Sequence, residues 1–193
     1  MFKKYQIKEF QKVLKCNVLK VNANSKNKLN KVFEDDEKFY FSDGARIFAT
    51  EKFELDGKFS VEKNGDMVKS LKSFFSPIKN YDNYIVVNTK DIKELYNQIK
   101  ENGIKKDRIG EYPVEFELKT TNGKVKAWFN LLILLPIANL FGSENVSIKL
   151  YFDKENSCAP FYCKGDGWDY LFLGMKRCIN APLKLDYIVE YNA

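Results

Sequence analysis

The chain has 193 residues, of which 45% are hydrophobic and 30% are charged; this composition excludes a disordered chain and suits one compact domain or two small ones. It contains no histidine, which excludes a Ser-His or Cys-His nucleophile and the commonest general base near neutral pH. The 32 lysines and arginines exceed the 26 aspartates and glutamates, for a formal net charge of +6. That excess favours a polyanionic partner only if the cations gather on one face.

Hydrophobic periodicity in the first 80 residues predicts two helices separated by strands. The first helix is expected over residues 6–16, with Ile7, Phe10 and Leu14 on its apolar stripe. The expected strands cover residues 30–34, 38–42, 46–54 and 58–62. Asp66 is a candidate N-cap for a second helix over residues 67–75.

The rest of the chain repeats this order of helices and strands. Asn88 can cap a helix over residues 89–102, which Gly103 would end. Thr121-Asn122-Gly123 lies between two alternating runs and is a strong hairpin signal. A further helix is expected over residues 130–140, with Pro136 inside it or at its first turn. The strands expected here cover residues 84–87, 114–119, 124–129, 146–152, 161–164, 169–173 and 183–191.

A helix followed by several strands, repeated, is typical of an α+β fold with antiparallel sheets. Parallel βαβ units would require strands and helices to alternate singly. The polar segment at residues 80–83 lies between complete elements and is the expected boundary. The sequence therefore predicts one domain at residues 1–80 and a second at residues 84–193.

Three of the predicted helices carry lysines at the same phase relative to the apolar stripe. In a helix that advances about 100° per residue, these lysines fall a quarter-turn from the stripe. If the helices pack side by side, they would present one cationic face suited to a phosphate backbone. The alternative is that each lysine is an ordinary solvent-exposed residue. The candidate DNA-binding residues are Lys8, Lys12, Lys15, Lys69, Lys93 and Lys100.

No motif for catalysis, metal or cofactor binding stands out. The sequence has no phosphate-binding loop, no dinucleotide-binding glycine pattern and no C-x-x-C pair. The four cysteines, at positions 16, 158, 163 and 178, are expected to be reduced and in or near the core. A non-enzymatic protein without a cofactor is therefore expected. The alternative is a metal-dependent enzyme that uses Asp43, Asp166 or Asp169 in a cleft.

Several segments resemble the bacterial β sliding clamp. Ser42-Asp43-Gly44-Ala45-Arg46-Ile47 is similar to the T-D-G-x-R-L stretch of its middle domain. Phe129-Asn130 opens a helix as in the last clamp domain, and Tyr170–Arg177 is similar to its closing strand. The resemblance is strongest over residues 84–178 and suggests the last two clamp domains. Gly174-Met175 departs from the family's Met-Pro, and the chain continues beyond it.

The resemblance implies a DNA-clamp-like fold and a processivity factor that binds double-stranded DNA without sequence preference. It further implies a cytoplasmic protein, without a membrane partner, that forms a homo-oligomeric ring. A groove between two domains would bind peptides from replication polymerases or clamp loaders. The implied peptide-binding residues are Gly44, Ala45, Arg46, Ile47, Met175, Lys176 and Arg177. The alternative within this fold is an adaptor or decoy that binds partners without encircling DNA.

Overall fold

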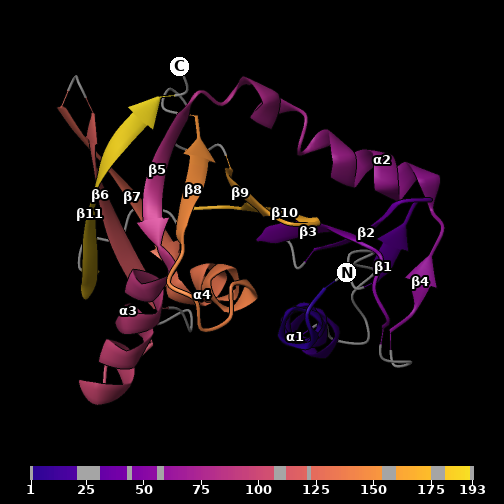
Figure 1. Ribbon diagram of the computed structural model, residues 1–193, viewed down its shortest axis with the longest axis horizontal. Coiled ribbons are helices and arrows are strands. Elements are labelled where there is room, and N and C mark those ends of the chain that lie inside the picture. The colour runs from indigo at the N-terminus through magenta and orange to yellow at the C-terminus, as the bar shows by residue number, and fades with distance from the viewer. Residues whose placement is uncertain are drawn as a thin grey trace. The chain divides into compact units, whose positions relative to one another are not determined.

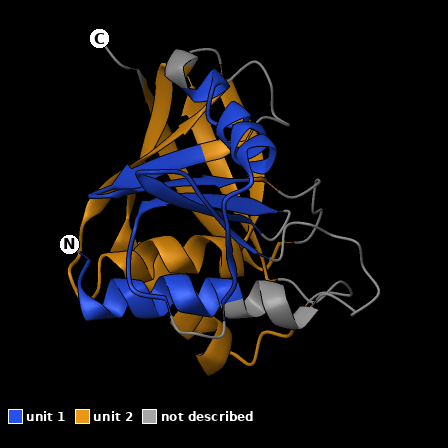
Figure 2. Ribbon diagram, turned by 90° about the vertical axis from the view of Figure 1, so that its right-hand side faces the viewer, with its two compact units in different colours: residues 1–80, 162–172 blue, residues 81–161, 173–193 orange. Residues whose placement is uncertain are grey.

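The computed structural model describes residues 2–20, 31–42, 45–55, 59–106, 112–120, 123–153, 160–174 and 181–191, without the side chains of 15–20, 79–80 and 191. The chain divides into two compact units (Figure 2). Unit 1 comprises residues 1–80 and 162–172, and unit 2 comprises residues 81–161 and 173–193. Among the described helices, none is long and apolar enough to cross a membrane.

Unit 1 is a sheet with one helix on each face. Its elements are α1 (Lys4–Lys20), β1 (Val32–Glu34), β2 (Lys38–Ser42), β3 (Arg46–Glu51), β4 (Val61–Glu62), α2 (Gly65–Ser73), the 3₁₀ helix η1 (Pro77–Asn80), β9 (Phe161–Gly165) and β10 (Trp168–Phe172). The strand order is β4-β1-β2-β3-β10-β9. Strand β1 runs antiparallel to β2, β2 to β3, and β3 to β10, while β1 and β4 are parallel.

Successive residues of a strand point to opposite faces of the sheet, and in β2 and β3 both faces are apolar. Phe10 of α1 meets Phe41 and Phe48, at ring-centroid distances of 6.3 and 5.7 Å. Val68 and Leu71 of α2 pack instead with the neighbouring residues of the same strands, Tyr40, Ile47 and Ala49. Helices α1 and α2 therefore cover opposite faces, and Figures 1 and 2 show the strands of unit 1 between them.

Unit 2 is a sheet with two helices packed against each other. Its elements are β5 (Asn83–Asn88), α3 (Thr89–Glu101), β6 (Pro113–Thr120), β7 (Gly123–Asn130), α4 (Leu131–Leu140), β8 (Ser147–Phe152) and β11 (Leu183–Tyr191). The strand order is β8-β5-β11-β6-β7. All neighbours are antiparallel except β11 and β6, which are parallel.

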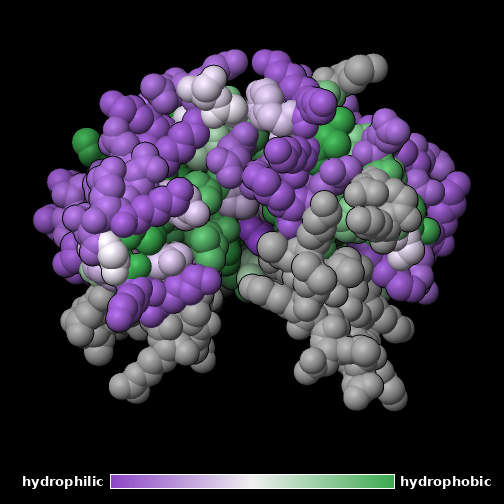
Figure 3. All heavy atoms as spheres, turned by 90° about the horizontal axis from the view of Figure 1, so that it is seen from below, coloured by the Kyte–Doolittle hydropathy of each residue, from purple (hydrophilic) through white to green (hydrophobic). Residues whose placement is uncertain are grey.

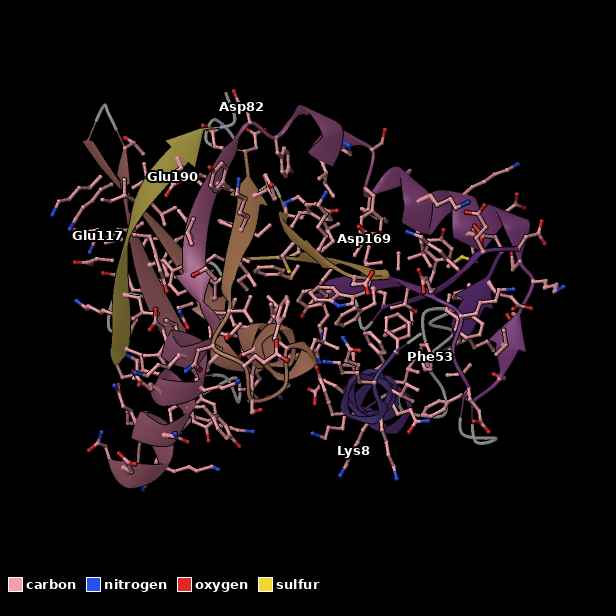
Figure 4. All side chains as sticks on the ribbon, in the orientation of Figure 1. Lys8, Phe53, Asp82, Glu117, Asp169 and Glu190 are labelled. Carbon is pink, nitrogen blue, oxygen red and sulfur yellow. The ribbon has the colours of Figure 1, made fainter. Side chains whose placement is uncertain are left out.

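Only one face of the unit 2 sheet is fully apolar. Its buried side chains include Ile85, Leu150 and Phe116, whereas Ile188 on the opposite face is 70% exposed. The exposed face carries paired charges, among them Lys124 with Glu117 at 2.6 Å and Lys119 with Asp186 at 3.7 Å. Figure 4 labels Glu117 on β6 and Glu190 on β11. Cross-strand pairs of this kind stabilise a solvated sheet face.

The α+β fold class and every helix predicted from the sequence are confirmed. Asn88 caps α3 by accepting a hydrogen bond from the Lys90 amide at 2.8 Å. The cap of α2 differs from the prediction: Asn64, not Asp66, accepts from the Met67 amide. Pro136 lies inside α4.

The topology has two features that the sequence does not indicate. The sheets are not purely antiparallel, because β1 pairs with β4 and β6 with β11 in parallel. The units divide at residues 80–81, but residues 162–172, which the sequence placed in the second domain, belong to unit 1. The reason is the pairing of β10 with β3, a contact between segments distant in the sequence.

We expect Phe10→Ala to lower the free energy of unfolding by about 3–5 kcal/mol. Phe10 is fully buried and contacts Phe2, Phe53, Phe41 and Phe48, so truncation leaves a cavity under α1. The matched control is Tyr5→Ala on the same helix, where the side chain is 37% exposed and the cost should stay within about 0.5 kcal/mol. Urea unfolding followed by circular dichroism gives both values. Equal costs would contradict the packing described for α1.

Candidate functional site

Helix α1 is the most cationic of the helices that the structure describes. Its sequence contains five lysines and one glutamate, which gives a formal charge of +4. Lys8 and Lys12 are exposed, and Figure 4 shows Lys8 directed away from the unit 1 sheet. Lys12 pairs with the buried Glu9 at 3.0 Å. The outward surface of α1 can therefore contact a polyanion without rearranging the core.

Lys69 does not lie on the surface that carries Lys8 and Lys12. It is exposed on α2, and α2 covers the opposite face of the unit 1 sheet from α1. The single cationic face predicted from the shared phase of the lysines is therefore not formed in unit 1. The phase of a residue on its helix does not determine which face of a sheet the helix covers.

The lysines of α3 are engaged with neighbouring groups of unit 2. Lys93 donates a hydrogen bond to the Gly142 carbonyl at the end of α4, and Lys100 lies 4.5 Å from the centre of the Tyr96 ring. The outward surface of α3 is mainly hydrophilic (Figure 3). The helix contains three lysines, two glutamates and one aspartate, so its formal charge is zero. Lys15 is also a candidate DNA-binding residue, but its side chain is outside the part that the structure describes.

The structure describes part of the predicted peptide groove. Gly44 and Met175, Lys176 and Arg177 lie outside the described residues. Ala45 and Arg46 are half-buried. Arg46 at the start of β3 pairs with Phe172 at the end of β10. The start of β3 and the end of β10 thus lie side by side in unit 1.

Ile47 is covered by α2. Its side chain is 9% exposed and belongs to a cluster with Val68 and Leu71 of that helix. Leu171, opposite Ile47 in the register of β3 and β10, belongs to the same cluster. A partner side chain could reach Ile47 only after α2 moves.

The carboxylates proposed for a metal-dependent enzyme do not converge in the described part of the chain. No group of three histidine, cysteine or acidic residues that could hold a metal ion occurs there. Asp169 accepts from Lys38 at 2.8 Å and from the Tyr162 hydroxyl at 2.7 Å, while Asp166 is exposed in a turn. Asp43 lies outside the described residues. Asp169 therefore belongs to a network of ion pairs and hydrogen bonds.

Asp35, between β1 and β2, is a second carboxylate held by several donors. Its oxygens accept from the Lys38 and Glu37 amides at 2.7 and 2.9 Å, from the Tyr40 hydroxyl at 3.1 Å and from the Lys72 ammonium at 2.6 Å. Burial alone would raise the pKa of this carboxyl, but these four donors together hold it well below its ordinary value. The expected strands over residues 30–34 and 38–42 leave room for a turn here, but no local signal indicates the contact with α2.

We expect Asp35→Asn to lower the free energy of unfolding near neutral pH by about 1–3 kcal/mol. Because the pKa of Asp35 is lower in the folded chain than its ordinary value of 3.8, the ionised carboxylate stabilises the fold above that value. This stabilisation is lost as the pH falls further, so the variant should lose less stability on acidification than the wild type. Asp36→Asn, at an exposed neighbour, is the control. Parallel pH profiles for wild type and Asp35→Asn would refute the expectation.

No protein-family model matches this sequence, and no curated protein matches it significantly. Among solved structures, the chain is similar to a putative DNA polymerase III β subunit from Eubacterium rectale ATCC 33656, with a TM-score of 0.54 and 14% identity over 89% of this chain and 64% of that one. The β subunit from Borrelia burgdorferi gives a TM-score of 0.52 at 14% identity, over 90% and 62% of the two chains. The β subunit from Pseudomonas aeruginosa gives 0.50 at 10% identity, over 86% and 65%.

The chain spans less than two thirds of the length of each of these structures. The likeness extends over most of this chain and includes both units, because each alignment covers at least 86% of it. At this level of identity the comparison establishes the fold. The chain therefore has the fold of the DNA polymerase III β subunit, the bacterial sliding clamp.

Proposed function

We propose that the chain is a sliding-clamp-like processivity factor that contacts double-stranded DNA without sequence preference and binds peptides from replication partners. The observation that carries this proposal is the fold shared with the β subunits over most of the chain. The proposed role needs no chemistry, which agrees with a chain that contains no histidine. We further propose that the protein is cytoplasmic, acts without a cofactor and assembles into a homo-oligomeric ring.

The proposed DNA contact is centred on α1. A formal charge of +4 on one helix, with Lys8 and Lys12 exposed, suits electrostatic contact with phosphates and offers no pattern for reading bases. Lys15 belongs to the same helix and is a further candidate. Lys93 and Lys100 on α3 are secondary candidates, because their helix is neutral overall. Lys69 is assigned no DNA contact, since α2 covers the other face of the unit 1 sheet.

The proposed peptide contact is at the start of β3 and beyond the end of β10. Ala45 and Arg46 would form one wall, and Met175, Lys176 and Arg177 the other. Ile47 would join this surface only when α2 leaves its place over the strands. A small apolar groove with a polar rim can hold a linear peptide through one or two anchor side chains.

We expect the double variant Lys8→Gln/Lys12→Gln to bind duplex DNA more weakly than the wild type at low salt. Each lysine that contacts a phosphate releases a counterion, so the slope of log affinity against log salt concentration should fall by roughly 2. Lys69→Gln/Lys72→Gln, on the opposite face of unit 1, is the matched control and should leave the slope unchanged. Fluorescence anisotropy with a labelled random-sequence duplex measures both. An equal loss in the two double variants would place the contact elsewhere.

We expect Met175→Asp to abolish binding of a polymerase-derived clamp-binding peptide, whereas Met175→Leu retains it. A buried apolar anchor contributes about 1.5–3 kcal/mol, and a carboxylate in its place would be desolvated without a partner. Titration of the labelled peptide into each variant measures the affinity, and circular dichroism checks the fold. Failure of the folded wild-type protein to bind any such peptide would overturn the peptide contact while leaving the DNA contact open to its own test.

A further inference from the structure

A pocket opens on the face of the unit 1 sheet that α2 covers. It lies at the pair formed by Tyr40 of β2 and Ala49 of β3, and Ala49 is two residues beyond Ile47. Its volume is about 360 Å³, within the range of small-molecule sites, about 300–1,000 Å³. All of its lining residues belong to unit 1. They are Lys38, Tyr40, Ala49, Lys72, Phe75, Ile78, Tyr162 and Asp169.

Two matched sets of polar groups border this pocket. In each set a carboxylate accepts one hydrogen bond from a tyrosine hydroxyl and one from a lysine ammonium. The first set is Asp35 with Tyr40 and Lys72, at 3.1 and 2.6 Å. The second is Asp169 with Tyr162 and Lys38, at 2.7 and 2.8 Å. These contacts hold the lysines and tyrosines at fixed places on the rim.

The remaining lining is apolar and comes from three elements. Ala49 of β3 has a small side chain between Tyr40, its partner on β2, and Asp169, its partner on β10. Phe75 follows α2, Ile78 lies in η1, and both are partly buried against the core cluster. The rings of Phe75 and Tyr162 meet edge to face, with 6.5 Å between their centroids. This arrangement leaves a recess with aromatic and branched aliphatic walls.

We propose that this pocket binds a small molecule in which an aromatic or branched apolar group carries a carboxylate. The apolar group would lie against Ala49, Phe75 and Ile78, and the carboxylate would accept hydrogen bonds from Lys38 and Lys72. This binding does not presuppose the proposed DNA or peptide contacts. It requires only the fold of unit 1.

The unused hydrogen-bond donors of the rim favour an anion. The rim contains two ammonium groups and two carboxylates, and both oxygens of Asp35 and of Asp169 already accept hydrogen bonds. Each ammonium has three N–H donors, of which the ion pairs described above use one. The side chains of Lys38 and Lys72 are 35% and 52% exposed, so they can turn toward a ligand without leaving their partners.

Tyr40 adds a neutral hydroxyl to the polar rim. Burial, together with the charges of Asp35 and Asp169, raises the pKa of Tyr40 far above its ordinary value. The Tyr40 hydroxyl therefore keeps its proton throughout the physiological range and donates a hydrogen bond to Asp35. Tyr40 thus adds no negative charge that would repel the carboxylate.

The test uses two probes of the same shape and different charge, N-acetyl-phenylalanine and N-acetyl-phenylalaninamide. Titration of the full chain, followed by NMR or calorimetry, should show saturable binding of the acid and at least about tenfold weaker binding of the amide, the loss of one charge-assisted hydrogen bond. Absence of saturable binding by the acid would overturn the proposal. Equal affinity for acid and amide would overturn the anionic ligand class.

A matched pair of variants on α2 tests the location. Lys72→Met removes a rim ammonium and should weaken binding of the acid about tenfold, whereas Lys69→Met on the same helix should leave it unchanged. Ile78→Ala, which removes an apolar contact and leaves both lysines in place, should weaken acid and amide alike. Circular dichroism confirms that each variant is folded. Unchanged binding in both Lys72→Met and Ile78→Ala would place the ligand at another site.

Discussion

The burial of both faces of β2 and β3 is the constraint on which the rest of unit 1 depends. Phe39, Tyr40 and Phe41 are consecutive and all are buried, although successive residues of a strand point in opposite directions. Two separate apolar surfaces therefore have to be covered. Helix α1 covers the surface of Phe41 and Phe48, and α2 covers that of Tyr40 and Ala49. A unit built in this way has two sheet faces, each covered by its own helix.

Unit 2 differs from unit 1 because only one face of its sheet has to be covered. Its sheet has one apolar face, and α3 and α4 pack against each other. Its other face is solvated and carries ion pairs such as Lys126 with Glu115 at 2.8 Å. Cations on this face are matched by anions, as they are on α3. The excess positive charge of the described helices is therefore concentrated on α1, where a non-specific polyanion contact would be expected.

The α2 face of unit 1 brings two proposed binding functions close together. Ile47 and Ala49 are two residues apart on β3 and point to the same side; the first is covered by α2, and the second forms part of the pocket beside it. Lys72 of α2 lines the pocket, whereas Leu71 of the same helix packs in one cluster with Ile47. Movement of α2 would therefore change both sites at once. The two proposed binding functions would then be coupled through one helix.

Local signals in the sequence determined the secondary structure closely. The apolar periodicity predicted α1 and α3, and Asn88 predicted the start of α3. Gly103 and Gly142, with φ of 60° and 67°, follow the ends of α3 and α4. These features depend on residues within a few positions of each other, where helix periodicity, capping and left-handed glycine conformations act. The same is true of the hairpin of β6 and β7, joined by a short turn.

Only the tertiary structure decided which faces the helices cover and which distant groups meet. Lysines at one helical phase on α1 and α2 lie on opposite sides of the sheet, because the phase orients a side chain only relative to its own helix. The ion pair of Lys38 with Asp169 joins residues 131 positions apart, and it exists because β10 pairs with β3 in register. No local pattern encodes such a register, since it is set by the burial of two apolar sheet faces at once.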